Sequence, residues 1–138
     1  MNIVIVGGNG RNTQQDRQAV NELVDKLHQK HANCLFVTTA HSDGVGKFVR
    51  EKCIEKDSRG KFKYQLALIN IQLFVSNLPR AEVTALYQAR NPAMLEIGDI
   101  FYYFANVSRS GMMEDMIAKA VSMNRPAKIF QIGDDVTV

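Results

Sequence analysis

The sequence has no long apolar run and no leader-like beginning. None of its 138 residues fall in a stretch of about 18 or more apolar residues, so we expect no membrane-spanning helix. The chain starts directly with a strand-like segment, Asn2 to Val6, without the charged region or cleavage site of a signal peptide. These absences predict a protein that remains in the cytoplasm.

Cysteine and histidine are scarce, with two and three residues respectively. Cys34 and Cys53 stand in apolar surroundings without metal-ligand spacing, which favours buried free thiols in a reducing compartment. His28, His31 and His41 form no metal-binding pattern. The sequence therefore predicts neither a metal site nor a bound cofactor.

The charge balance is only weakly basic. The chain has 17 Lys and Arg against 14 Asp and Glu, a formal net charge of +3. No cluster of basic residues with interleaved aromatic residues occurs, so we do not expect a nucleic-acid partner. The short basic run Arg59, Lys61 and Lys63 surrounds Gly60 and is typical of a solvated turn.

What the sequence does contain is an alternation of apolar runs and amphipathic stretches, with 46% hydrophobic residues over a length typical of one domain. The apolar runs predict strands at residues 2–6, 33–39, 64–75, 100–105 and 127–132. The amphipathic stretches predict helices at residues 13–30, 46–56 and 81–90, a helical turn through 95, and a helix from 111. This order predicts a single Rossmann-like domain over residues 1–138. Its class is α/β, with a doubly wound parallel sheet of about five strands and helices on both faces. Thr13 is the expected N-cap of the first helix, and we expect the tail 133–138 to be loose.

Ligands of such sheets bind outside the carboxyl ends of the strands, where three loops rich in glycine and small polar residues are expected. The first loop is Gly7-Gly8-Asn9-Gly10-Arg11. It is neither a dinucleotide fingerprint, because Asn12 and Thr13 stand where a glycine is needed, nor a P-loop, because no Gly-Lys-Ser/Thr follows. It is either a backbone cradle for a phosphate or sugar, or a tight turn that needs a positive φ.

The second loop runs from Thr39 to Gly46 and contains His41-Ser42-Asp43. Adjacent side chains point away from one another, so these three residues do not form a catalytic triad. Asp43 or Ser42 is better explained as the N-cap of the following helix. A role of this loop in lining a pocket stays open, with candidate residues Thr39, His41, Ser42, Asp43 and Gly44.

The third loop, residues 106–111, joins a strand to a helix, which is the arrangement that binds anions at helix N-termini. Arg90, on the preceding helix, is able to hold a phosphate bidentately; the alternative is a surface ion pair. Glu114, in the first turn of the next helix, is able to bind a ribose hydroxyl or act as an acid or base; the alternative is compensation of the helix dipole.

At these residues the chain resembles the SLOG superfamily of Rossmann-like domains. That superfamily includes the LOG cytokinin-activating phosphoribohydrolases, the DNA-processing protein DprA/Smf and the small YspA-like domains. Arg90, Asn91 and Met94 match the Arg-Lys-x-x-Met segment of LOG proteins, with Asn91 in place of lysine. Asp99 matches their strand opener. The end of their Pro-Gly-Gly-x-Gly-Thr-x-x-Glu motif is matched by Gly111, Met112 and Glu114, with Met112 in place of threonine. The YspA-like branch is more similar, since it has an Arg-Asn-x-x-Met segment.

The resemblance implies a pocket for a nucleotide or nucleotide-derived ligand. Arg90 and Glu114 match the catalytic pair of the LOG enzymes, which hydrolyse the N-glycosidic bond of nucleoside monophosphates. The missing Pro-Gly-Gly and threonine remove elements that cradle the phosphate. The further ligand-binding positions that this comparison and the loop pattern suggest are Asn91, Ser108, Ser110, Gly111 and Met112.

Three hypotheses therefore remain. The chain is a nucleotide-binding sensor or sequestering protein, a nucleoside-phosphate N-glycosidase, or an oligomeric protein with a vestigial pocket. The apolar segments 64–75 and 81–95 also predict a homodimer or higher homo-oligomer.

Overall fold

The computed structural model describes residues 1–8, 10–69, 90–106 and 111–138. Five parallel strands form one sheet in the order β3-β2-β1-β4-β5. They are β1 (Asn2–Gly7), β2 (Leu35–Thr39), β3 (Gln65–Ile69), β4 (Ile100–Phe104) and β5 (Ala127–Phe130). The chain adds β2 and β3 on one side of β1 and then β4 and β5 on its other side, as in a doubly wound Rossmann-like sheet. This topology confirms the predicted fold class.

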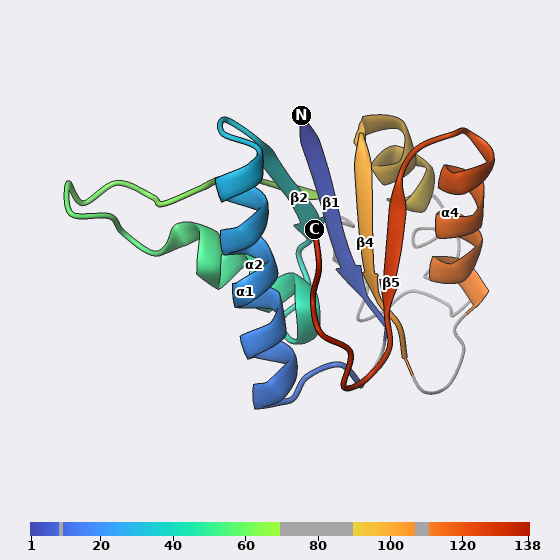
Figure 1. Cartoon of the computed structure of the whole chain (residues 1–138), viewed down its shortest axis with the longest axis horizontal. Helices are drawn as coiled ribbons and strands as arrows, with labels where there is room; N and C mark the ends of the chain where they lie inside the picture. The colour runs from blue at the N-terminus through green and yellow to red at the C-terminus, as the bar shows by residue number, and fades with distance from the viewer. Residues whose placement is uncertain (9, 70–89, 107–110) are drawn as a thin grey trace, which may run out of the picture.

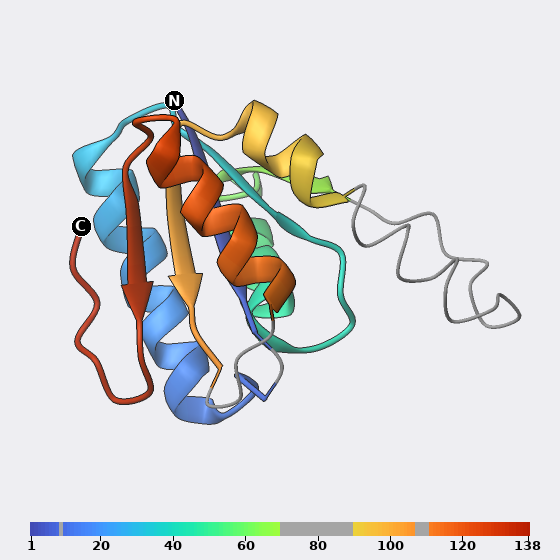
Figure 2. The ribbon, with the colours of Figure 1, turned by 90° about the vertical axis from the view of Figure 1, so that its right-hand side faces the viewer.

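Helices cover both faces of the sheet (Figures 1 and 2). On one face lie α1 (Gln14–Lys30) and α2 (Gly44–Ile54), and their apolar sides share a core with Ile3 and Ile5 of β1. On the other face lie α4 (Gly111–Ser122) and the helical residues 90–97, which pack on Val4 and Val6. Because β1 is buried on both faces, its sequence is apolar at every central position.

The first helix begins as its sequence predicts. The side chain of Thr13 accepts a hydrogen bond from the Asp16 backbone N–H at 3.1 Å, and the Asp16 carboxylate accepts one from the Thr13 N–H at 3.2 Å. This reciprocal capping box confirms Thr13 as the N-cap. Val20, Leu23, Val24 and Leu27 then form the buried face of α1.

Several predicted boundaries are corrected. The second helix begins at Gly44, two residues before the predicted Gly46. Asp43, which has an extended backbone, is its N-cap. β5 ends at Phe130. The third predicted strand is described only as β3, which begins at Gln65, one residue after Tyr64. Residues 70–75 of the predicted strand and the predicted helix 81–90, except Arg90 itself, lie outside the described residues.

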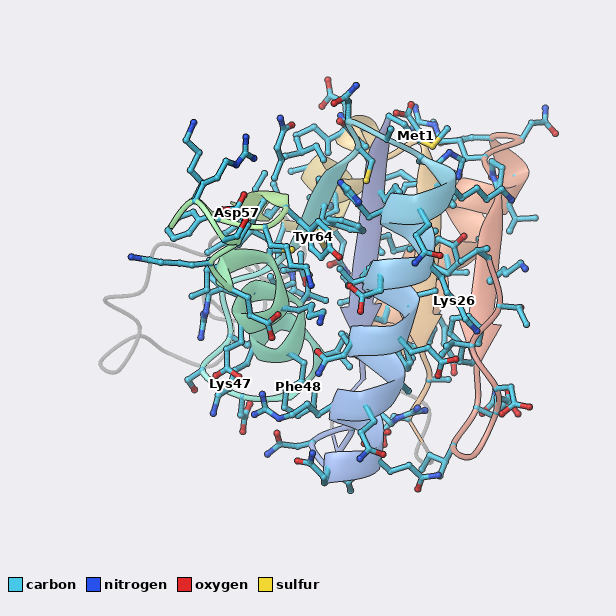
Figure 3. All side chains as sticks on the ribbon, turned by 60° about the vertical axis from the view of Figure 1, so that its left-hand side comes forward. Met1, Lys26, Lys47, Phe48, Asp57 and Tyr64 are labelled. Atoms are coloured by element: carbon cyan, nitrogen blue, oxygen red, sulfur yellow. The ribbon has the colours of Figure 1, made fainter. Side chains whose placement is uncertain are left out.

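The tail after β5 is not loose, contrary to expectation. Val136 is only 3% exposed and belongs to the core on the α1 side of the sheet. The Lys26 side chain of α1 donates a hydrogen bond to the Val136 carbonyl at 3.1 Å, on the side where Figure 3 shows Lys26 directed toward the tail. Val136, together with the partly buried Val138, thus fixes the tail against the core on the α1 side.

No helix in the described parts of the chain has both the length and the apolar character needed to cross a membrane.

Candidate functional site

A cavity of about 280 Å³ lies at the carboxyl ends of β1 and β2, where the fold is expected to bind a ligand. The first loop and the second loop form its opposing walls, and α2 begins at its edge. The described residues that line it are Gly7, Gly8, Gly10, Arg11, Asn12, Thr39, His41, Asp43, Gly44, Val45 and Gly46.

The two loops are connected by a hydrogen bond. The Gly44 N–H, at the start of α2, donates to the Asn12 side-chain oxygen at 3.0 Å. Asp43 occupies the N-cap position, but its side chain makes no capping hydrogen bond. The positive end of the α2 dipole therefore lies at the cavity wall without a capping carboxylate bound to it, which favours an anion there.

The glycines of both loops are needed for close packing. A Cβ on Gly7 would lie 2.3 Å from Val45 Cγ2, and one on Gly46 would lie 2.7 Å from the Thr39 carbonyl oxygen. Gly10 has a φ of +85°, the positive value that the tight-turn alternative for the first loop requires. The glycines therefore let α2 approach the strand ends, and their backbone forms much of the cavity wall.

Arg11 lines the cavity but has a structural role. Its Nε donates to the Asp16 carboxylate at 2.9 Å, and its Nη1 donates to the carbonyls of Ala105 and Phe130 at 2.7 and 3.2 Å. Arg11 is 3% exposed and its guanidinium also lies 5.3 Å from the centre of the Phe104 ring. The ion pair connects the first loop to α1, and the hydrogen bonds to the two carbonyls connect it to the ends of β4 and β5. The spacing of Arg11 and Asp16 around the Thr13 cap is a sequence signal for such a contact.

Arg90 and His41, predicted from separate segments, meet in the structure. Arg90 Nη1 lies 3.0 Å from His41 Nε2, while Arg90 Nε and Nη2 donate to the Asn91 side-chain oxygen at 3.3 and 3.2 Å. A guanidinium has only donors, so His41 Nε2 accepts and the imidazole is neutral with its proton on Nδ1. Arg90 is 7% exposed, which excludes the alternative of a surface ion pair.

The surroundings of His41 also lower its pKa from the usual value. Burial contributes most, the positive charge of Arg90 adds to it, and Asp43 opposes it. The backbone carbonyl of His41 accepts a hydrogen bond from Arg50 Nη1 at 3.3 Å. His41 is therefore held from both its ring and its backbone, at the border between the cavity and Arg90.

The other predicted residues lie in three different situations. Ser42 is exposed and Glu114 is half-buried in the first turn of α4, and neither lines this cavity. Gly111 is exposed, and a Cβ on it would meet no atom of the described residues within 4 Å. Asn9, Ser108 and Ser110 lie outside the described residues, as does the side chain of Met112. Sequence reasoning missed Asn12 and Val45, because a polar and an apolar residue beside a glycine loop carry no distinctive pattern.

Comparisons with known proteins add the following findings. No protein-family model matches the chain, and no curated protein matches it. Among solved structures, the Moco carrier protein from Chlamydomonas reinhardtii matches with a TM-score of 0.49 and 12% sequence identity, over 96% of this chain and 77% of that chain. At this level of similarity we draw no inference from it about a ligand.

Proposed function

We propose that the chain binds the phosphate-bearing part of a nucleotide or nucleotide-derived ligand, as a sensor or sequestering protein. The observation that carries this proposal is the cavity at the carboxyl ends of β1 and β2, with its walls of glycine backbone and the start of α2. Its volume of about 280 Å³ is just below the range of pockets that hold whole small molecules, roughly 300–1,000 Å³. A phosphoribosyl group matches that size, and the base would extend beyond it.

Two positive features at the cavity support an anionic ligand, whereas the Asp43 carboxylate in its lining opposes one. The positive end of the α2 dipole is at the wall, and Arg90 holds His41, which lines the cavity, in a fixed tautomer. The neutral imidazole of His41 is part of the cavity wall, and Arg90 adds positive charge behind it. In this proposal Arg90 acts mainly through His41, as a positioning residue.

Thermal denaturation with nucleotides and with the matching nucleosides tests the proposal. A ligand at 100 times its dissociation constant stabilises the folded state by about 2.7 kcal/mol, which is a readily measured rise in Tm. We expect a rise with nucleoside monophosphates, cyclic nucleotides, NAD or ADP-ribose, and none with unphosphorylated nucleosides. Equal rises with nucleosides, or no rise with any compound, would contradict the proposal, and the second result would favour a vestigial pocket.

Two substitutions locate the binding. Asp43→Asn removes a negative charge beside the cavity but keeps a good N-cap residue, so phosphate affinity should rise severalfold. Glu96→Gln is the matched control, because it makes the same change of carboxylate to amide at an exposed residue that does not line the cavity. Equal effects of the two variants would mean that the site lies elsewhere.

The N-glycosidase hypothesis is tested in the same samples. Chromatography after incubation shows whether the ligand is recovered intact or a free base is released. Base release that stops in Glu114→Gln, with affinity retained, would replace the sensor by an enzyme in which Arg90 and Glu114 are the catalytic pair.

A further inference from the structure

A second and larger cavity lies at the opposite, amino ends of the strands. Its volume is about 650 Å³, and it is found at the beginnings of β2 and β3, beneath the segment that connects α2 to β3. Figure 1 shows this connecting segment, residues 55–64, extending away from the body of the molecule. The cavity is therefore separate from the one at the carboxyl ends of the strands, with no lining residue in common.

The walls of this cavity combine rings with positive charge. Phe62, Tyr64 and Ile54 provide aromatic and aliphatic surface. His28, Arg59 and Lys63 provide basic groups, and the described residues that line the cavity include no carboxylate. Such a lining matches a ligand that has an apolar ring and a negative charge.

The aromatic wall is fixed without a ligand. The Tyr64 hydroxyl donates a hydrogen bond to the Asp25 carboxylate of α1. Its ring centre lies 4.4 Å from that of His28 and 5.8 Å from that of Phe36, the latter in an edge-on arrangement. Figure 3 shows Tyr64 between the connecting segment and α1. Its position is therefore determined by the core and not by solvent.

The basic wall is also built in advance. The Asp57 carboxylate accepts hydrogen bonds from the backbone N–H groups of Arg59 and Lys61 at 2.8 and 3.1 Å, which closes the turn around Gly60. An antiparallel bridge between Lys56 and Phe62 pairs the two arms of the segment. The turn therefore presents Arg59, Phe62 and Lys63 together on the cavity side.

Phe62 itself has no role in the core. Its side chain is 65% exposed, although phenylalanine is usually buried in folded proteins. An aromatic ring left in water beside a cavity gains from contact with a second ring. This exposure is the observation that separates the cavity from an ordinary gap between elements.

We propose that this cavity binds an organic anion that carries an aromatic ring. The ring would contact Phe62 and Tyr64, and the anionic group would lie between Lys63, Arg59 and His28. A bare inorganic anion would leave the apolar walls in water. A neutral ring would leave the Lys63 ammonium, which forms no ion pair with a described residue, without a counter-charge, whereas the Arg59 guanidinium is already paired with the Asp57 carboxylate at 3.0 Å. The inference does not depend on the function proposed for the other cavity.

Two fluorescent probes that share one skeleton test the proposal. 8-Anilino-1-naphthalenesulfonate has the fused ring and a sulfonate, whereas N-phenyl-1-naphthylamine has the ring without the charge. We expect saturable binding of the sulfonate with one site per chain, and binding of the neutral probe about tenfold weaker. Circular dichroism in the near ultraviolet checks that the protein remains native, because loosely packed states also bind the sulfonate.

Two lysines in the same segment provide a matched pair of variants. Lys63 lines the cavity, whereas Lys61, two residues earlier, is exposed and does not line it. Lys63→Gln should weaken binding of the sulfonate probe about tenfold, and Lys61→Gln should leave it unchanged. Equal loss in both variants would show attraction by net charge alone and would overturn the site.

The aromatic contact has its own control. Phe62→Ala should weaken binding of the probe about threefold to tenfold, while Ile132→Ala, which trims another exposed apolar side chain, should not. Binding of the probe should also be unchanged by His41→Ala and by added nucleotide, which separates this site from the first cavity. Sedimentation that shows a dimer dispersed by Phe62→Ala, without probe binding, would instead make this face an interface between copies and overturn the proposal.

Discussion

His41 is kept neutral by the groups around it. Its imidazole is half-buried and accepts a hydrogen bond from the Arg90 guanidinium. A protonated ring could not accept this bond, because both of its nitrogens are donors. Neither residue is distinctive alone, since His41 is one of three histidines and Arg90 one of many basic residues. The pair becomes a candidate functional element only because the end of β2 and the helix over residues 90–97 bring the two side chains together.

The lowered pKa of His41 makes a prediction about stability and pH. The folded pKa lies below the unfolded value of about 6.5, so between these two values the unfolded chain binds more protons. Stability should therefore fall as the pH falls from about 6.5 to the folded pKa, and this part of the loss should be absent in His41→Gln. Urea denaturation at a series of pH values measures the difference. An identical pH dependence in both proteins would contradict the prediction.

The cause of the shift is tested separately by following the His41 ring protons with NMR. Arg90→Met removes a positive charge but keeps the bulk of the side chain, so the His41 pKa should rise toward its usual value. Burial is the larger cause, so part of the shift should remain. A pKa that stays unchanged in Arg90→Met would leave burial as the sole cause.

At the scale of elements, the start of α2 decides the shape of the first cavity. Two glycines within three residues, Gly44 and Gly46, make it a poor helix start by propensity alone. Gly46 is nevertheless required, because a Cβ there would lie 2.6 Å from the Thr39 side-chain oxygen and 2.7 Å from its carbonyl oxygen. The helix therefore touches the end of β2 directly, and the loop between them lines the cavity.

Replacing glycine by alanine in two helices should have opposite results. Gly46→Ala should destabilise the fold by about 1–3 kcal/mol, because the clash with the Thr39 backbone outweighs the better helix propensity of alanine. Gly111→Ala, in the first turn of α4, places its Cβ within 4 Å of no atom in the part of the chain that the structure describes, so it should be neutral or stabilise by up to about 1 kcal/mol. Denaturant unfolding measures both. A Gly46→Ala protein as stable as the wild type would mean that α2 is free to move away from β2.

At the scale of the whole molecule, one sheet separates two cavities of different character. The cavity at the carboxyl ends is small, with backbone walls and the start of a helix. The cavity at the amino ends is larger, with aromatic and basic walls. Because all strands are parallel, their carboxyl ends lie together on one side of the sheet and their amino ends on the other. The two cavities are therefore formed by different loops, and substitutions in the lining of one leave the lining of the other unchanged.

The tail also contributes to the whole molecule, and its contribution is measurable. Val136 fills the core on the α1 side, so Val136→Ala should cost about 1–2 kcal/mol of unfolding free energy at roughly 0.8 kcal/mol for each buried methylene. Val121→Ala makes the same change at a side chain that is 58% exposed and should cost almost nothing. Equal effects on Tm would mean that the tail does not hold its place against α1.

The sequence by itself determined the elements and the class of fold. The fully apolar run at residues 2–6, the Thr13 cap and the spacing of Val20, Leu23 and Leu27 are local signals, and each predicts its element without reference to the rest of the chain. Alternation of strands and helices then predicts a parallel sheet, because parallel strands need a crossover between them. The candidate loops followed from the same rule, since ligands bind at the carboxyl ends.

Only the tertiary structure decided which residues meet. Arg11 was predicted to contact a ligand and lines the first cavity, and only the fold shows that its guanidinium also binds carbonyls at the ends of β4 and β5, more than 90 residues away. His41 was joined to Arg90 across 49 residues, and the tail became ordered by an apolar contact with a distant helix. The second cavity was not predicted, because the sequence placed Arg59 and Lys63 in a solvated turn, and only the fold brings them together with His28 of α1 and Ile54 of α2. Contacts of this kind depend on how elements pack, and packing is not encoded in the spacing of residues within any one element.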